Sequence, residues 1–382
     1  MQSRGPTHYR TCWPLLFACL LCACEVRTDI VAKLIVRDAA VVEPSCASTG
    51  TCDSGMDATE GMDATPEPAD ANVDAMVDID AGNPPKRGDC AAQSCNVLAT
   101  REAFCAAGQA ASVTIGDSCD SLNYPVFQFA VCTCLDLITN SPLEVSSADA
   151  AGASVAVNNE LRLGPETSID GSLYVSGHYG AASAPAIGGS FERNAAPRCA
   201  CDSKKFLDIS GMISARTRDN DNANALLTPT SLSGFDGGRS LTLDCGRYFF
   251  DRIAGNGLLQ IDVRGRVALF VARDLALDDG FRLTLQPGAT AEIYVGGNVL
   301  VRGKLDLGAS NGGGRVLLAV QDSGTIDVAD SYIDGSIYAP YETLTTRGAF
   351  ELHGSLFVNR ANFGAPATIR YARAVAVQPR CQ

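Results

Sequence analysis

Short apolar stretches broken by turn-forming residues recur along the second half of the chain. The heptapeptide Ile333–Ala339 (Ile-Asp-Gly-Ser-Ile-Tyr-Ala) reappears in related form at Leu352–Val358 and at Ile169–Val175. The central apolar residues of the successive stretches are spaced by 24, 25, 19 and 19 residues and are Leu269, Ile293, Leu318, Ile337 and Leu356. Short β-rich stretches at a period near 20 are typical of a β-solenoid. We therefore predict an all-β fold, a parallel β-helix.

The repeats also predict which side chains are buried. Side chains alternate between the two faces of a strand, so the central residue of each stretch points inward when its two neighbours point outward. Equivalent residues of successive solenoid turns lie about 4.8 Å apart, and the five central residues should therefore form one buried row. A β-sandwich of hairpins is the alternative, but it does not repeat one motif at this spacing.

A helical insert interrupts the predicted solenoid at residues 199–238. Asp202 or Ser203 is a suitable N-cap, and the spacing of Phe206, Ile209, Met212 and Ile213 predicts one apolar helical face. We expect this insert to be held by disulfides and to pack on the end or the side of the solenoid. The expected organisation is a Cys-rich N-terminal cap at 89–140, a first solenoid block at 141–198, the insert at 199–238, a main solenoid at 239–376 and a tail at 377–382.

The first 23 residues have the pattern of a lipoprotein signal peptide. Arg4 and Arg10 precede an apolar run that is too short to span a bilayer. The run ends in Leu-Cys-Ala-Cys, which resembles the lipobox and makes Cys24 the expected lipidation site. An ordinary signal peptide cut after Ala23 is the alternative. Glu25 follows the anchor, and by the lipoprotein sorting pattern the absence of Asp at this position predicts the outer membrane, facing the periplasm or the cell surface.

Residues 24–88 are expected to form the lipid anchor and a disordered linker. Nine acidic residues and no Lys or Arg fall between Asp53 and Asp80, and the segment has no aromatic residue. Such a segment buries too little apolar area to offset its chain entropy. It also carries much of the formal net charge of −13. The remainder is only mildly acidic and offers no positive field for nucleic acid, so nucleic-acid binding is excluded.

Twelve cysteines beyond Cys24 are candidates for disulfides, since an even number in a secreted chain favours pairing. They are Cys46, Cys52, Cys90, Cys95, Cys105, Cys119, Cys132, Cys134, Cys199, Cys201, Cys245 and Cys381. The two Cys-X-Cys pairs at 132–134 and 199–201 have an alternative role as four thiolate ligands of zinc, although the usual spacing is C-x-x-C. The pairing is left open by the sequence.

Several segments together resemble a family of Gram-negative surface lipoproteins to which no activity has been assigned. These segments are Cys199–Asp202, Leu207–Ile209, Asp219–Ala223, Cys245–Phe249, Gly265–Val271, Leu285–Ala289, Ile337–Pro340 and Ile369–Val375. The resemblance covers about residues 90–376. It implies a C-terminal parallel β-helix domain similar to repeats in pilus-assembly accessory and polymer-forming proteins. It implies an architecture and a location, not a chemistry.

No catalytic motif or cofactor site is recognisable in the sequence. Two histidines follow the signal peptide, His178 and His353, and both sit beside glycine in strand or turn contexts typical of a solvated surface. A weak calcium candidate is the Asx-rich segment containing Asp219 and Asp221, but it fails the EF-hand pattern and is better explained as a turn. We predict no catalytic residue, no metal and no cofactor.

Three functions remain to be distinguished. The first is a non-enzymatic envelope lipoprotein that presents a solenoid surface for binding or adhesion to an envelope glycan or protein. The second is a polymer-forming scaffold of stacked solenoids, against which the expected caps argue. The third is a carbohydrate-active β-helix enzyme, which lacks a recognisable site. The oligomeric state is not predicted.

Overall fold

The computed structural model describes residues 100–106, 127–147, 152–203, 206–308, 316–321 and 324–372. Contacts divide the chain into two units, Met1–Val77 and Asp78–Gln382, and every described residue belongs to the second unit. The predicted signal peptide, Cys24, the linker, the C-terminal tail and six of the cysteines (Cys46, Cys52, Cys90, Cys95, Cys119 and Cys381) lie outside the described residues. Within the described ranges, no helix is both long and apolar enough to cross a membrane.

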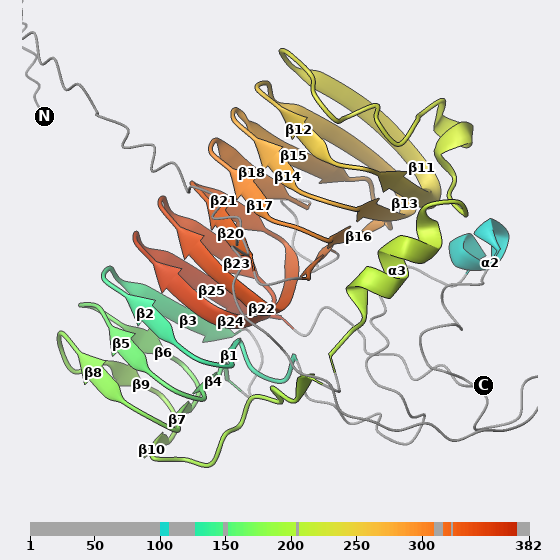
Figure 1. Cartoon of the computed structure of the whole chain (residues 1–382). Helices are drawn as coiled ribbons and strands as arrows, with labels where there is room; N and C mark the ends of the chain where they lie inside the picture. Colours follow the sequence, from blue (N-terminus) through green and yellow to red (C-terminus); the bar gives the residue numbers. More distant parts are fainter. Residues whose placement is uncertain are drawn as a thin grey trace, which may run out of the picture. The chain divides into compact units, whose positions relative to one another are not determined.

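The second unit is a parallel β-solenoid with three faces (Figure 1), as the repeat pattern predicts. Face 1 is built, in spatial order, from β11 (Arg239–Phe250), β13 (Leu259–Val271), β16 (Thr290–Val295), β19 (Val316–Val320), β22 (Gly335–Thr346), β24 (Leu356–Phe363), β1 (Val131–Thr133), β4 (Val155–Val157), β7 (Leu173–Val175) and β10 (Phe191–Arg193). Each pairs in parallel with the next, so backbone hydrogen bonds run along the whole stack.

The long strands bend at a corner and contribute to a second face as well. Face 2 contains β12 (Ile253–Gly255), β14 (Leu275–Leu277), β17 (Val299–Val301), β20 (Thr325–Val328), the second halves of β22 and β24, β2 (Leu137–Thr139), β5 (Leu161–Leu163) and β8 (Tyr179–Ala181). Face 3 contains the first halves of β11 and β13, β15 (Gly280–Leu285), β18 (Lys304–Leu307), β21 (Ser331–Ile333), β23 (Phe350–His353), β25 (Ala367–Tyr371), β3 (Leu143–Ser147), β6 (Ser168–Ile169) and β9 (Ala186–Ile187).

The order of the stack differs from the order of the chain. The C-terminal strands β24 and β25 pair with β1 and β3, so Leu356 lies beside Val131 and Ala367 lies beside Leu143. In Figure 1 the green N-terminal strands accordingly continue the stack beyond the red C-terminal ones. The sequence predicts an N-terminal cap that extends to residue 140, and this boundary is wrong. Residues 131–139 belong to the solenoid, because they form strands in the middle of the stack. A parallel edge accepts any strand of matching register, whatever its place in the sequence.

The predicted buried row is confirmed. The five central residues are register neighbours on face 1, and each is at most 1% exposed: Leu269, Ile293, Leu318, Ile337 and Leu356. The row continues through Val131, Val155 and Leu173 into the N-terminal strands. Their flanking residues point away from the interior, as expected, but on face 1 they are buried too. Phe270 stacks on Tyr294 at 5.0 Å and Tyr338 on Phe357 at 5.5 Å.

Helices cover this outer surface of face 1. α3 (Ile209–Arg216) and α2 (Arg101–Ala106) run beside the upper strands in Figure 1, and Ile209, Ile213 and Phe104 are buried there. The expected helix start at residues 202–203 is wrong. The helix begins at Ile209, because the side chain of Asp208 accepts a hydrogen bond from the backbone N–H of Gly211 at 2.8 Å. The helix packs on the side of the solenoid, not over its end.

The two ends of the stack differ in what covers the last turn. At the β11 end, residues 219–238 cover the first turn of the solenoid, where Leu232 is fully buried and Phe235 bridges to Gly255. These residues include the short helix η2 (Asn222–Ala225). At the opposite end, no described strand pairs beyond β8, β9 and β10. There Arg193 occupies an inward position beside Val175, and its guanidinium lies over the ring of Tyr179 at 4.3 Å.

Candidate functional site

Three disulfides join the helical segments to the solenoid. Cys132 pairs with Cys199 and Cys134 with Cys201, while a third bond links Cys105 of α2 to Cys245 of β11. The disulfide interpretation is thus confirmed for six of the twelve candidates. The zinc alternative for the two Cys-X-Cys pairs is wrong, because all four sulfur atoms form disulfides that join one Cys-X-Cys pair to the other. The bonds pin the connecting segment 199–201 against face 1.

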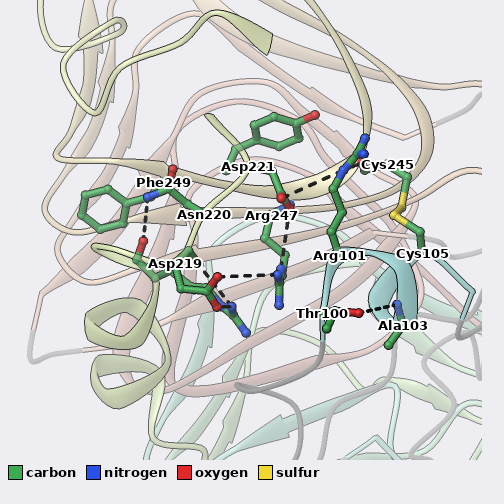
Figure 2. Close-up of polar contacts among 12 residues, drawn as sticks. Thr100, Arg101, Ala103, Cys105, Asp219, Asn220, Asp221, Cys245, Arg247 and Phe249 are labelled. Carbon is green, nitrogen blue, oxygen red and sulfur yellow. Dashed lines mark hydrogen bonds and ion pairs between the residues drawn. A yellow bond between two sulfur atoms is a disulfide. The ribbon is translucent and has the colours of Figure 1, made fainter. Parts of the chain in front are cut away.

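An ion-pair cluster lies where α2, α3 and β11 meet (Figure 2). Arg247 is 4% exposed, and its backbone N–H donates to Asp221 Oδ2 at 2.7 Å. Its guanidinium lies 3.6 Å from Asp221 and 3.9 Å from Asp219, which also pairs with the buried Arg216. Arg101 of α2 donates to the backbone carbonyl of Cys245 at 3.1 Å. The cluster therefore fastens both helices to the first turn of the solenoid.

The two calcium candidates, Asp219 and Asp221, belong to this cluster. Their carboxylates face arginine side chains, and the described part of the chain contains no group of three or more acidic, His or Cys residues suited to a metal ion. A calcium site needs six or more oxygen ligands, whereas these two carboxylates are committed to guanidinium partners. The arrangement favours a structural role for both residues.

A second buried polar group lies beneath α2. Glu292 is 4% exposed; it pairs with Arg266 at 2.8 Å and accepts the hydroxyl hydrogen of Tyr294 at 2.9 Å. The Arg266 guanidinium also lies 4.3 Å from the ring centroid of Phe104. Burial, reinforced by the charge of Glu292, raises the pKa of Tyr294 well above its usual value. Each of these polar groups has a partner within the fold, so their hydrogen-bonding capacity is used internally and none of them is directed at a ligand.

Faces 2 and 3 are the accessible surfaces of the solenoid. Adjacent outward residues on face 2 are Asp327, Thr345, Asn362, Ile138 and Arg162. Those on face 3 are Arg282, Asp306, Tyr332, Glu351, Thr368 and Glu144. Most are polar, and charges of opposite sign sit on neighbouring turns, as in the pairs of Arg347 with Asp327 at 2.9 Å and of Arg360 with Asp136 at 3.0 Å. The result is two hydrogen-bonding surfaces on which charges of both signs are interspersed.

The two histidines fall on these accessible faces. His353 on face 3 lies between Glu351, 2.8 Å away, and the hydroxyl of Tyr332 at 3.5 Å, with its ring packed edge-on against the tyrosine. Its side chain is 20% exposed, which is less than a fully solvated residue would be. His178 is exposed on face 2 immediately before β8. The expected surface setting therefore describes His178 well and His353 only in part.

A shallow depression of about 410 Å³ lies at the His178 end of face 2, over β2, β5 and β8. Its polar lining includes Asn140, Glu160, Arg162 and His178, and its apolar lining includes Pro165. Glu160, immediately before β5, and Arg162 within β5 form an ion pair of 2.6 Å. Neither residue was singled out from the sequence. The alternation of charged and leucine residues at 160–163 is a signal that both charges face outward.

Comparisons with known proteins give a match of part of the chain to one family model and a distant structural likeness. Residues 199–377 match a family model described as a domain of unknown function, DUF7305. No curated protein matches the chain. A similar solved structure is the ice-binding protein of the Antarctic ascomycete Antarctomyces psychrotrophicus, with 11% sequence identity, a TM-score of 0.31, and coverage of 66% of this chain and 98% of that chain. These comparisons identify no catalytic family for the chain.

Proposed function

We propose that this chain is a non-enzymatic cell-envelope lipoprotein that binds a hydrophilic envelope partner through the accessible faces of its solenoid. The observation that carries the proposal is the contrast between the three faces. Face 1 is closed off by α2, α3 and the disulfides, whereas faces 2 and 3 expose regular rows of hydrogen-bonding side chains. A flat polar surface of opposite charges in register suits a partner rich in donors and acceptors.

The two ends of the solenoid differ in their surroundings, which supports the same function. At the β11 end, the bond between Cys105 and Cys245 fixes α2 against the stack. The stack of ten strands on face 1 spans on the order of 40 Å at about 4.8 Å per turn. The β8–β10 end is the far end of that stack, and no described strand pairs beyond it.

Two measurements test the proposal. Replacing the anchor, Cys24→Ser, should move the protein from the detergent phase to the aqueous phase of a detergent phase partition, which reports the lipid whatever the protein binds; retention in the detergent phase would refute the lipid anchor. The soluble variant should then co-sediment with isolated cell envelopes. The fraction of the variant bound to envelopes should not change when they are washed with moderate salt and no reductant. Salt screening weakens binding little when the binding surface carries charges of both signs. Failure to co-sediment with envelopes from any growth condition would refute the binding function.

A further inference from the structure

We infer that the depression over β2, β5 and β8 is a saccharide-binding site. This inference deepens the proposed function by naming the site and its class of ligand. It starts from Glu160 and Arg162, which present a carboxylate and a guanidinium side by side, with side chains 29% and 64% exposed. A carboxylate only accepts hydrogen bonds and a guanidinium only donates them. Neighbouring hydroxyls of a sugar ring each donate and accept, so they match this pair.

The depression exists because one turn lacks a side chain. Gly180 is the register neighbour of Arg162 on the next turn, and a Cβ built on Gly180 meets no atom within 4 Å. The space beside the Arg162 side chain is therefore open and has a backbone floor. His178, which is exposed, adds an imidazole to the lining, and Asn140 adds an amide. Pro165 supplies an apolar wall of the kind that packs against the C–H face of a sugar.

The charge balance argues against other ligand classes. Glu160 and Arg162 offset each other, so the depression has no surplus of positive charge with which to hold a phosphate polymer. A divalent cation would need several gathered carboxylates, and no such group occurs among the described residues. A peptide could instead add as a strand to the open edge of β8. Such a peptide would use the backbone of β8 and would not need the side chain of Arg162.

The location of the depression agrees with recognition of an external partner. It occupies the last turns of the stack, at the end opposite the Cys105–Cys245 bond. Nothing in the described fold covers it, whereas the β11 end is covered by residues 219–238. The depression is therefore accessible to a polymer that approaches this end of the solenoid.

Two glycine substitutions provide a matched test. Gly180→Leu fills the depression, and Gly234→Leu places the same side chain at the other end of the molecule. A Cβ meets no atom within 4 Å at either position, and neither glycine has a positive φ, so both variants should keep the unfolding midpoint of the parent. The parent is the full mature chain carrying Cys24→Ser. The probe is a printed panel of neutral and uronic-acid oligosaccharides, followed by calorimetric titration of the strongest binder.

We expect the parent and Gly234→Leu to bind with equal affinity, and Gly180→Leu to bind at least tenfold more weakly. Arg162→Ala should weaken binding several-fold. Equal binding by both glycine variants would overturn the site while leaving envelope binding intact. Binding to envelopes without binding to any saccharide of the panel would overturn the ligand class. Retained envelope affinity in Arg162→Ala together with its loss in Gly180→Leu would favour addition of a peptide strand at β8 and would also overturn the inference. Absence of both envelope and saccharide binding would refute the proposed function itself.

Discussion

Truncation of Leu318 tests the buried row of face 1. Leu318 is 1% exposed and lies between Ile293 and Ile337 on the adjacent turns. Leu318→Ala removes buried carbon atoms and leaves a cavity. The cost of such cavities is about 2–5 kcal/mol and depends on how far the surroundings collapse. Here the turns are held at a spacing of about 4.8 Å by backbone hydrogen bonds and cannot close on the gap. We therefore expect a loss of about 3–5 kcal/mol in the free energy of unfolding.

The loss can be measured by urea unfolding of the soluble mature chain, followed by circular dichroism. Tryptophan fluorescence is unsuitable, because the one Trp of the chain is Trp13 in the predicted signal peptide. The matched control is Arg302→Ala, which removes a 74% exposed side chain paired with Asp278 at 3.1 Å. An exposed ion pair of this kind contributes about 0–1 kcal/mol. A loss below about 1 kcal/mol for Leu318→Ala, or equal losses for the two variants, would refute the burial of the row.

Three further predictions follow from the stack. A Thr368→Cys, Glu144→Cys double variant should form a disulfide under mild oxidation, because these outward residues are register neighbours on β25 and β3; a chain stacked in sequence order would leave them apart. Stability should fall between pH 10 and 12, since burial raises the pKa of Tyr248 from 10.0 to about 12 and the unfolded chain loses that proton first; Tyr248→Phe should make this part of the profile of unfolding free energy against pH less steep. Arg193→Val, which restores the apolar row of Val175, should promote end-to-end association in sedimentation velocity, and a sedimentation coefficient equal to that of the parent would contradict a blocking role for Arg193.

The turns of the solenoid could be predicted from sequence, but their spatial order could not. The motif at Ile333–Ala339 and Leu352–Val358 places equivalent residues on adjacent turns, and the structure agrees. The pairing of β25 with β3 joins residues more than 200 positions apart in the chain. Nothing local distinguishes this junction from the pairing of two consecutive turns, because all of them use the same apolar alternation. The cap boundary at residue 140 failed for this reason.

The candidate sites could likewise be predicted from the sequence only in part. The alternation around Leu161 and Leu163 is enough to place Glu160 and Arg162 outward. The depression beside them depends on Gly180. Only the register of β5 with β8 places Gly180 next to Arg162, and this register cannot be read from the local sequence. The calcium candidates illustrate the converse. Asp219 looks like a free oxygen ligand in the sequence, and its commitment to arginines appears only when α3 and β11 are packed together.

Hydrogen exchange of the soluble mature chain, with and without bound saccharide or envelope fragments, tests most directly where this solenoid meets its partner. The account predicts slower amide exchange on binding at residues 160–166 and 178–184, and no change in α3 or along face 1. Slower exchange confined to residues 219–238 at the β11 end, or centred on the helices of face 1, would contradict it.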